Sequence, residues 1–200
     1  MIAPYRGLGI VIDIGTGDGR FVSASAKANP DQFFIGIDAN AKPLEKLSTK
    51  ITRKPAKGGL PNTMFVQAAV EDLPEEFAGI ADEIYINFPW GSLLGAVANG
   101  DQRILALLSR SMISHGRLTV TMGIDPRRDH AELDRLGIPQ IGLDYLGSTL
   151  KACYQEAGFR MVECRELAIS EWSRIETSWA RKLGENDERK VFQMEFVDVT

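Results

Sequence analysis

The sequence predicts an α/β fold in which a mostly parallel sheet is covered by helices on both faces. Short apolar, β-branched runs alternate along the chain with helix-compatible segments, which is the pattern of βα units. Glycine, proline and asparagine punctuate these segments, and no internal repeat or low-complexity tract interrupts them. A chain of 200 residues can bury one self-sufficient core, so we expect residues 1–200 to form a single domain.

Seven strands are expected, and each is a buried apolar run that stops at a turn or polar residue. They cover residues 8–14, 33–37, 63–66, 83–87, 117–122, 160–168 and 191–199. Helices are expected over residues 21–28, at the helical spacing of Leu44, Leu47 and Ile51, and over residues 101–112. The last strand alternates apolar and polar residues and follows no clear crossover helix, so we expect it to insert antiparallel.

Composition excludes several classes of protein. The net charge is −4, from 23 basic and 27 acidic residues, so any nucleic-acid contact must come from a local basic patch. No apolar run approaches the roughly 18 residues of a membrane span, and the apolar start has no basic leader. Cys153 and Cys164 form no CxxC pair, and His115 and His130 share no ligand spacing with them. We therefore expect a cytoplasmic protein with reduced thiols and no metal.

A glycine-rich loop, Gly15-Thr16-Gly17-Asp18-Gly19, follows the first strand. Open α/β sheets bind ligands beyond the carboxyl ends of their strands, and glycines let the backbone approach a ligand closely. Asp38, which ends the second strand, is placed where a carboxylate accepts both hydroxyls of a ribose. A cofactor that contains a nucleoside is therefore expected at this edge of the sheet.

The same loop separates two classes of cofactor. A dinucleotide fingerprint, GxGxxG, needs glycine where this chain has Arg20. A pyrophosphate also prefers neutral amides, whereas Asp13 and Asp18 bracket this loop with negative charge. S-adenosylmethionine carries a sulfonium and an ammonium group, which carboxylates favour. The pattern acid-x-Gly-x-Gly-x-Gly is that of class I S-adenosylmethionine-dependent methyltransferases, which have a Rossmann-like fold, and it nearly excludes a nicotinamide dehydrogenase.

An aromatic loop, Asn87-Phe88-Pro89-Trp90-Gly91, follows the fourth strand. It resembles the Asn-Pro-Pro-aromatic loop of enzymes that methylate adenine amino groups. Stacking on an aromatic ring contributes roughly 1–3 kcal/mol per base, and proline stiffens the loop before the base arrives. We interpret this stretch as a base-binding elbow; a core tryptophan in a tight turn is the alternative.

Two further tryptophans lie near the carboxyl end of the chain. Trp172, Ile175 and Trp179 are spaced as on one helix face, and ordinary packing explains Trp172 well. Spacing alone favours core packing for Trp179 too. Its position just before the loop 184–190 would also let it cover a ligand.

A basic segment lies between the second and third strands. Its net charge over residues 42–57 is +5, because a single acid, Glu45, accompanies six cations: Lys42, Lys46, Lys50, Arg53, Lys54 and Lys57. Salt screens charges more than roughly 8 Å apart, so this segment acts independently of the global charge. It indicates contact with a phosphate backbone, and a solvated helix face is the alternative. Weaker basic pairs are Arg127-Arg128, Arg181-Lys182 and Arg189-Lys190, the last preceded by the acids Glu185, Asp187 and Glu188.

With these stretches taken together, the chain resembles the 16S ribosomal RNA (adenine-1408-N1) methyltransferases, which confer aminoglycoside resistance. The resemblance runs from about Ile12 to Lys190. Its markers are residues 12–19, 54–59, 68–71, 88–91 and 179–183. Many methyltransferases share the glycine loop, whereas the Lys-Pro and Phe-Pro-Trp-Gly stretches are far more restrictive.

The resemblance implies roles for the matching residues. Trp90 and Trp179 would sandwich the flipped adenine, in the elbow that also holds Phe88 and Pro89. The cofactor S-adenosylmethionine, with S-adenosylhomocysteine as product, would be held by Asp13, Gly15, Gly17, Asp18, Asp38, Ala69, Glu71, Asn87, Ser92 and Thr177. The 16S RNA of the 30S subunit would be bound by Lys50, Arg53, Lys54, Lys57, Arg181, Lys182, Arg189 and Lys190. A monomer that acts away from membranes is expected.

The chain departs from the family pattern at two places, both of which contact the ribosome in the family. Only about eight residues precede the first strand, where the family has a hairpin, and acids interrupt the basic cluster after Trp179. Two alternative functions therefore stay open. One is a methyltransferase that acts on another RNA or on a small molecule, and the other is a weakly active homologue that binds cofactor and RNA.

Overall fold

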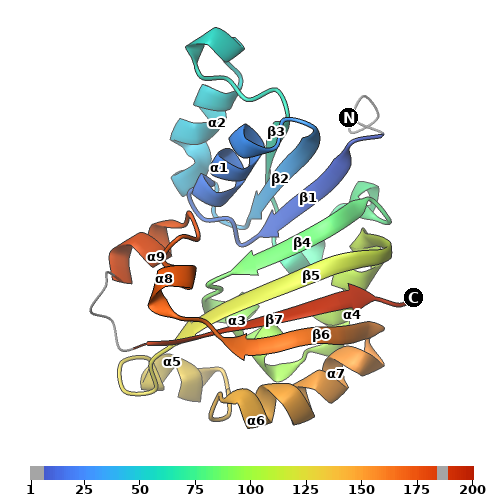
Figure 1. Ribbon diagram of the computed structural model, residues 1–200, viewed down its shortest axis with the longest axis vertical. Helices are drawn as coiled ribbons and strands as arrows, with labels where there is room; N and C mark the ends of the chain where they lie inside the picture. Colours follow the sequence, from blue (N-terminus) through green and yellow to red (C-terminus); the bar gives the residue numbers. More distant parts are fainter. Residues whose placement is uncertain (1–6, 184–188) are drawn as a thin grey trace.

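The structure is a computed structural model that describes residues 7–183 and 189–200. Its strands form one sheet in the order β3-β2-β1-β4-β5-β7-β6 (Figure 1). The strands are β1 (Gly9–Ile14), β2 (Gln32–Asp38), β3 (Thr63–Gln67), β4 (Ala81–Asn87), β5 (Met112–Ile124), β6 (Phe159–Glu166) and β7 (Lys190–Asp198). The α-helices are α1 (Arg20–Ala28), α2 (Glu45–Ile51), α3 (Gly91–Asn99), α4 (Gln102–Ser111), α5 (His130–Arg135), α6 (Leu143–Tyr145), α7 (Lys151–Glu156), α8 (Ile169–Trp172) and α9 (Ser178–Leu183). The shorter turns are η2 (Lys42–Leu44), η3 (Pro55–Lys57), η4 (Val70–Asp72), η5 (Glu75–Phe77) and the π-helical η6 (Leu146–Leu150).

The sheet is parallel except at β7, which pairs antiparallel with both β5 and β6. The reason is topological. Strand β6 ends at the carboxyl edge of the sheet, helices α8 and α9 follow at that edge, and β7 starts there, with Lys190 opposite Ile124 at the end of β5. The mostly parallel, seven-stranded sheet with an antiparallel last strand is confirmed.

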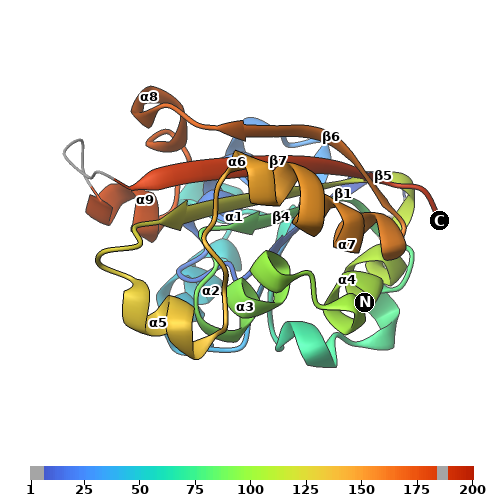
Figure 2. The same ribbon diagram turned by 90° about the horizontal axis from the view of Figure 1, so that it is seen from below.

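Alternate residues of β1 serve two hydrophobic layers. Ile10, Ile12 and Ile14 belong to the larger core, to which helices α3, α4 and α7 contribute. Val11 instead packs with Val22 of α1 in a smaller cluster on the other face. Figure 2 shows helices α3, α4, α6 and α7 gathered together beneath β5, β6 and β7. The order of strands reverses between β1 and β4, so the carboxyl ends of these two strands form the switch point where such sheets bind ligands.

Two expectations about helices need correction. Helix α3 was not anticipated, nor were α5, α6 and α7. Helix α3 starts at Gly91, the last residue of the aromatic loop, and ends before Gly100, where a side chain would collide with Cβ of Cys153 at 2.5 Å. The prediction that Trp172 and Trp179 share one helix face is wrong. Helix α8 ends at Trp172, and α9 begins six residues later, where the Thr177 hydroxyl accepts the Ala180 N–H at 3.0 Å. No helix among the described residues is both long enough and apolar enough to cross a membrane.

Candidate functional site

A cavity of about 270 Å³ lies at the carboxyl edge of the sheet. It brings together segments that follow β1, β2, β3 and β4. Its lining residues are Ile14, Gly15, Asp38, Ala39, Ala68, Ala69, Val70, Glu71, Phe88, Pro89, Trp90, Ser92 and Leu93. The glycine loop, the acids Asp38 and Glu71, and the aromatic loop therefore meet in one place, as the resemblance implies.

Backbone hydrogen bonds fix the glycine loop against β2. The N–H groups of Gly15 and Thr16 both donate to the carbonyl of Ile37, at 2.8 and 3.0 Å. The Gly17 N–H donates to one carboxylate oxygen of Asp38 at 2.8 Å. Gly15 has a φ of +75°, and a side chain there would meet Leu93 at 2.7 Å, so only glycine fits this turn.

The half-buried carboxylate of Asp38 is oriented by two backbone donors. Its second oxygen accepts the Asn40 N–H at 2.8 Å. Each carboxylate oxygen has a second lone pair, so both still accept hydrogen bonds from a ligand in the cavity. This geometry agrees with the expected role of Asp38 toward a ribose.

Asp13 lies behind the cavity wall and is buried, with 2% of its surface exposed. The side-chain amide of Asn87 donates to its carboxylate at 3.3 Å. Burial raises the pKa of Asp13 to about 7, the Asn87 hydrogen bond opposes that rise, and the negative charge of Asp38 adds to it. A cation placed beside this pair favours the ionised form of Asp13.

The aromatic loop adopts an unusual backbone conformation. Phe88 has a φ of +49°, the left-handed region that bulky side chains rarely adopt, and its N–H donates to the Thr121 carbonyl at 2.7 Å. Phe88 and Pro89 are buried, whereas Trp90 is 48% exposed at the cavity rim. The turn therefore leaves the Trp90 side chain partly exposed at the rim of the cavity that Asp38 and Glu71 also line.

Trp179 reaches this loop through Phe88. Their rings stack with centroids 4.6 Å apart and planes 18° apart. The guanidinium carbon of Arg189 lies 5.2 Å from the centroid of Trp179. Trp179 is half-buried and does not line the cavity, but Phe88, against which it stacks, does. Figure 1 shows α9, which carries Trp179, beyond the carboxyl ends of β1 and β4.

Other expected cofactor residues lie outside the lining of the cavity. Asp18 pairs with the Arg20 guanidinium, with Nε and the carboxylate oxygen 2.6 Å apart. Thr177 caps helix α9. Gly17 and Asn87 support Asp38 and Asp13 from behind.

The expected RNA-binding residues fall into two groups. Most of them are exposed cations on α2, on η3, between these two elements, or on α9: Lys50, Arg53, Lys54, Lys57, Arg181 and Lys182. Lys190 is exposed and lies 3.8 Å from a carboxylate oxygen of Glu166. Arg189 differs, because its side chain is only 12% exposed and forms an ion pair with Asp129. The acids Glu185, Asp187 and Glu188 and the residues ahead of Gly7 lie outside the described part of the chain.

Asp129, which forms an ion pair with Arg189, was not anticipated from the sequence. A usable signal existed, because residues 125–129 follow the carboxyl end of β5, at the edge where ligands bind. Gly123, where a side chain would meet the Trp179 ring at 2.5 Å, was not anticipated either.

The chemistry of the cavity wall separates the cofactor classes. Within the described part of the chain, Asp38 and Glu71 are the ionisable residues that line the cavity, and no lysine or arginine does so. A pyrophosphate would face two carboxylates there without a compensating cation, whereas a cationic ligand is favoured.

Comparison with known proteins identifies the family of this chain. The family model described as NpmA: 16S rRNA (adenine(1408)-N(1))-methyltransferase matches residues 4–197. The chain belongs to this family. A relative named 16S rRNA (adenine(1408)-N(1))-methyltransferase, from Escherichia coli, is 35% identical over 184 residues, which is 92% of this chain and 84% of the relative.

Solved structures of family members have the same fold. The crystal structure of the aminoglycoside resistance methyltransferase NpmB1 is 47% identical, with a TM-score of 0.86 over 98% of this chain and 91% of that one. The W203A mutant of the 16S rRNA (adenine(1408)-N(1))-methyltransferase from Catenulisporales acidiphilia, solved with cosubstrate SAM, is 29% identical, with a TM-score of 0.89 over 99% and 90% of the two chains. The predicted family and fold class are confirmed, and the roles of individual site residues stay predictions.

Proposed function

We propose that this protein is an S-adenosylmethionine-dependent methyltransferase that methylates N1 of adenine 1408 in the 16S RNA of the 30S subunit and so confers aminoglycoside resistance. Family membership supports this reaction. The observation that carries it is that Asp38, Glu71 and the exposed Trp90 line one and the same cavity. One side of this cavity suits a cationic nucleoside, and the other suits a planar base.

The residues present fit the cofactor. S-adenosylmethionine, when bound, supplies a methyl group activated by a sulfonium centre. Asp38 offers two oriented oxygens to a ribose, and Glu71 extends the acidic wall. Behind them Asp13 is held by Asn87 and has a pKa of about 7, so a nearby positive charge keeps it ionised. Gly15 keeps the wall open where a side chain would collide with Leu93.

The aromatic residues suit a flipped adenine. Trp90 presents an indole face at the cavity rim, and Phe88 connects it to Trp179. Adenine N1 carries a free lone pair at neutral pH, so the protein needs no general base, and no histidine or lysine lines the described cavity. The positive charge that develops on the methylated base is stabilised by indole faces, by about 1–2 kcal/mol. The protein therefore contributes position and charge stabilisation.

The exposed cations of α2 and η3 supply the RNA contact. Four of them lie within eight residues: Lys50, Arg53, Lys54 and Lys57. Their charge attracts a phosphate backbone, although the whole protein carries a net charge of −4. The protein would act as a monomer in the cytoplasm, where 30S subunits are found.

Methylation of purified 30S subunits with labelled methyl donor tests the proposal. A reverse-transcription stop map is then expected to show one new stop at adenine 1408, because an N1-methyl group blocks base pairing. Isolated transfer RNA and free nucleosides serve as competing substrates in parallel reactions. Methylation of either one, without methylation of 30S subunits, would contradict the proposal and select another substrate. Cofactor binding without turnover on any of them would select a binding protein.

A further inference from the structure

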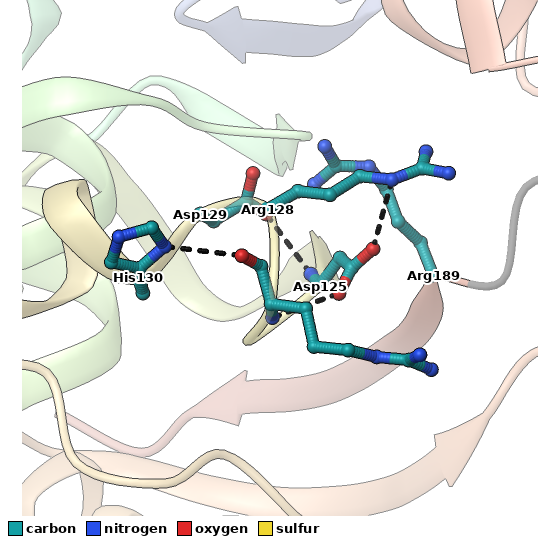
Figure 3. Close-up of polar contacts among 6 residues, drawn as sticks. Asp125, Arg128, Asp129, His130 and Arg189 are labelled. Carbon is teal, nitrogen blue, oxygen red and sulfur yellow. Dashed lines mark hydrogen bonds and ion pairs between the residues drawn. The ribbon is translucent and has the colours of Figure 1, made fainter.

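The turn after β5, residues 125–129, places two carboxylates in a buried setting. Asp125 and Asp129 are both buried. A carboxylate oxygen of Asp129 accepts the Asp125 N–H at 2.9 Å, and a carboxylate oxygen of Asp125 accepts the Arg127 N–H at 2.9 Å. Figure 3 shows these groups together with Arg128, His130 and Arg189. The Arg128 guanidinium lies 3.3 Å from Asp125, so each carboxylate faces an arginine.

Asp129 connects this turn to the base-binding side of the cavity. Its carboxylate accepts a hydrogen bond from the Arg189 guanidinium, and their side chains are 5% and 12% exposed. Arg189 in turn lies over the Trp179 ring, which stacks on Phe88 of the aromatic loop. These contacts form one continuous series from a residue that does not line the cavity to one that does.

We propose that Asp129 is a positioning residue that holds the Arg189 guanidinium over Trp179 and so fixes the Trp179 ring against Phe88. The proposal concerns the orientation of the second tryptophan and rests on the proposed function. A nearly buried guanidinium is held less strongly when a carboxylate partner beside it loses its negative charge, and it then gains by moving toward water. If it moves, one face of Trp179 loses its packing partner, and the ring acquires freedom that a stacking base must then remove.

The Asp129→Asn variant isolates the charge. The same Asp129 oxygen accepts the Asp125 N–H and the Arg189 guanidinium, so the asparagine oxygen retains both acceptor positions and only the negative charge is lost. We expect kcat for methylation of 30S subunits to fall about tenfold, because small misplacements of a positioning group carry costs of this kind. The KM for 30S subunits and the Kd for S-adenosylmethionine are expected to change less than about twofold.

Glu132→Gln is the matched control. It removes one carboxylate from the adjoining helix α5, where the half-buried Glu132 pairs with the exposed Arg135 at 2.7 Å. No change in kcat is expected. A double-mutant cycle adds a second control, because Asp129→Asn introduced into Arg189→Gln is expected to lower kcat no further. Additive losses would show that Asp129 acts by another route.

A second readout reports on Trp179 without any substrate. A Trp90→Phe background leaves two tryptophans, Trp172 and Trp179. Because Trp172 is only 1% exposed, acrylamide quenching of the fluorescence comes mainly from Trp179. Asp129→Asn is expected to increase this quenching about twofold, and Glu132→Gln is expected to leave it unchanged. This measurement needs no substrate, so it tests the role of Asp129 even if the unmodified protein does not methylate 30S subunits. Failure of the proposed function and failure of this inference are therefore distinguished.

The proposal fails if quenching and kcat are both unchanged, or if KM falls while kcat stays constant. The second result would mean that Asp129 restrains Arg189 from binding RNA and does not position Trp179. If Asp129→Asn does not fold, Arg189→Lys replaces it, because lysine keeps the charge and loses the planar guanidinium that lies over the ring. Increased quenching with reduced kcat is again expected, and unchanged values would overturn the proposal.

Discussion

The side of the cavity that we propose for the cofactor (the cofactor side) and the side that we propose for the base (the base side) are built in different ways. On the cofactor side, backbone groups do most of the positioning: the N–H groups of Gly15 and Thr16 bond to Ile37, and that of Gly17 bonds to Asp38. These contacts join two adjacent parallel strands. Most substitutions leave backbone donors in place, so this side depends mainly on the residues of its own motif.

On the base side, side chains position one another across long separations in sequence. Phe88 follows β4, Trp179 belongs to α9, and Arg189 and Asp129 join the start of β7 to the turn after β5. Here stacking and an ion pair replace backbone hydrogen bonds. A substitution in a distant segment of the chain therefore changes the geometry of the base side more readily than that of the glycine loop.

The largest expected effect is that of Trp90→Ala, which should lower activity on 30S subunits without weakening cofactor binding. Trp90→Ala removes the exposed indole, and we expect kcat/KM on 30S subunits to fall about 100-fold, since stacking contributes roughly 1–3 kcal/mol per base. Calorimetry is expected to give a Kd for S-adenosylmethionine within about threefold of the unmodified value. Trp90→Phe is the control and should keep most of the activity. An equal loss of cofactor affinity would mean that Trp90 is structural.

The next effect concerns Asp13 on the cofactor side and depends on pH. Its pKa is raised to about 7 in the folded protein, so the folded state binds a proton more tightly than the unfolded state, and stability falls as pH rises from about 4 to 7. Asp13→Asn removes this penalty and is expected to raise the free energy of unfolding at pH 8 by about 2–4 kcal/mol. At pH 4 the variant should show little gain. Denaturant unfolding at the two pH values measures the difference.

The same variant is expected to bind S-adenosylmethionine at least about tenfold more weakly at pH 8, because a negative charge near the cofactor is lost. In the unmodified protein, affinity should rise with pH through about 7 as Asp13 ionises. A variant that is more stable and binds the cofactor equally well would place Asp13 outside the binding machinery.

A smaller effect is expected on the RNA contact. The double variant Lys54→Ala, Lys57→Ala should weaken binding to 30S subunits about tenfold and reduce the salt dependence of that binding. Cofactor affinity should not change. Arg103→Ala removes an exposed cation from α4 and is the control. Equal weakening by the control would attribute the effect to overall charge.

The smallest expected effect lies within the glycine loop. Asp18 pairs with Arg20 at the surface, so Asp18→Asn should change the Kd for S-adenosylmethionine less than about threefold, through a charge acting at long range. Isothermal titration of both proteins decides this. A loss as large as that of Asp13→Asn would bring Asp18 into direct contact with the cofactor.

Much of the fold could be predicted from local sequence. Each expected strand is present, with ends that differ by a few residues, because a short, β-branched apolar run bounded by turn residues favours a buried strand over a helix. The single helix expected through Trp172 and Trp179 was wrong because apolar spacing cannot show where a chain turns. Helix α3 was missed because its first residue, Gly91, was assigned to the aromatic loop; its φ of +61° is a left-handed conformation that glycine adopts readily.

Some residues of the candidate site could also be predicted from local sequence, and others could not. Asp38 and Glu71 could be placed at the cavity because each follows a strand whose carboxyl end faces the same edge. Arg189 could not be distinguished from the other cations. Its ion pair with Asp129 joins positions 60 residues apart, and no local pattern connects them.

The amino-acid sequence by itself determined the sheet, the glycine loop beside an acid, and the aromatic loop, since these depend on periodicity and on conformations available to neighbouring residues. The tertiary structure alone decided which aromatic ring faces solvent, which one stacks on Phe88, and which arginine is nearly buried. The physical reason is that backbone geometry acts over a few residues, whereas burial and charge pairing depend on every segment that folding brings together.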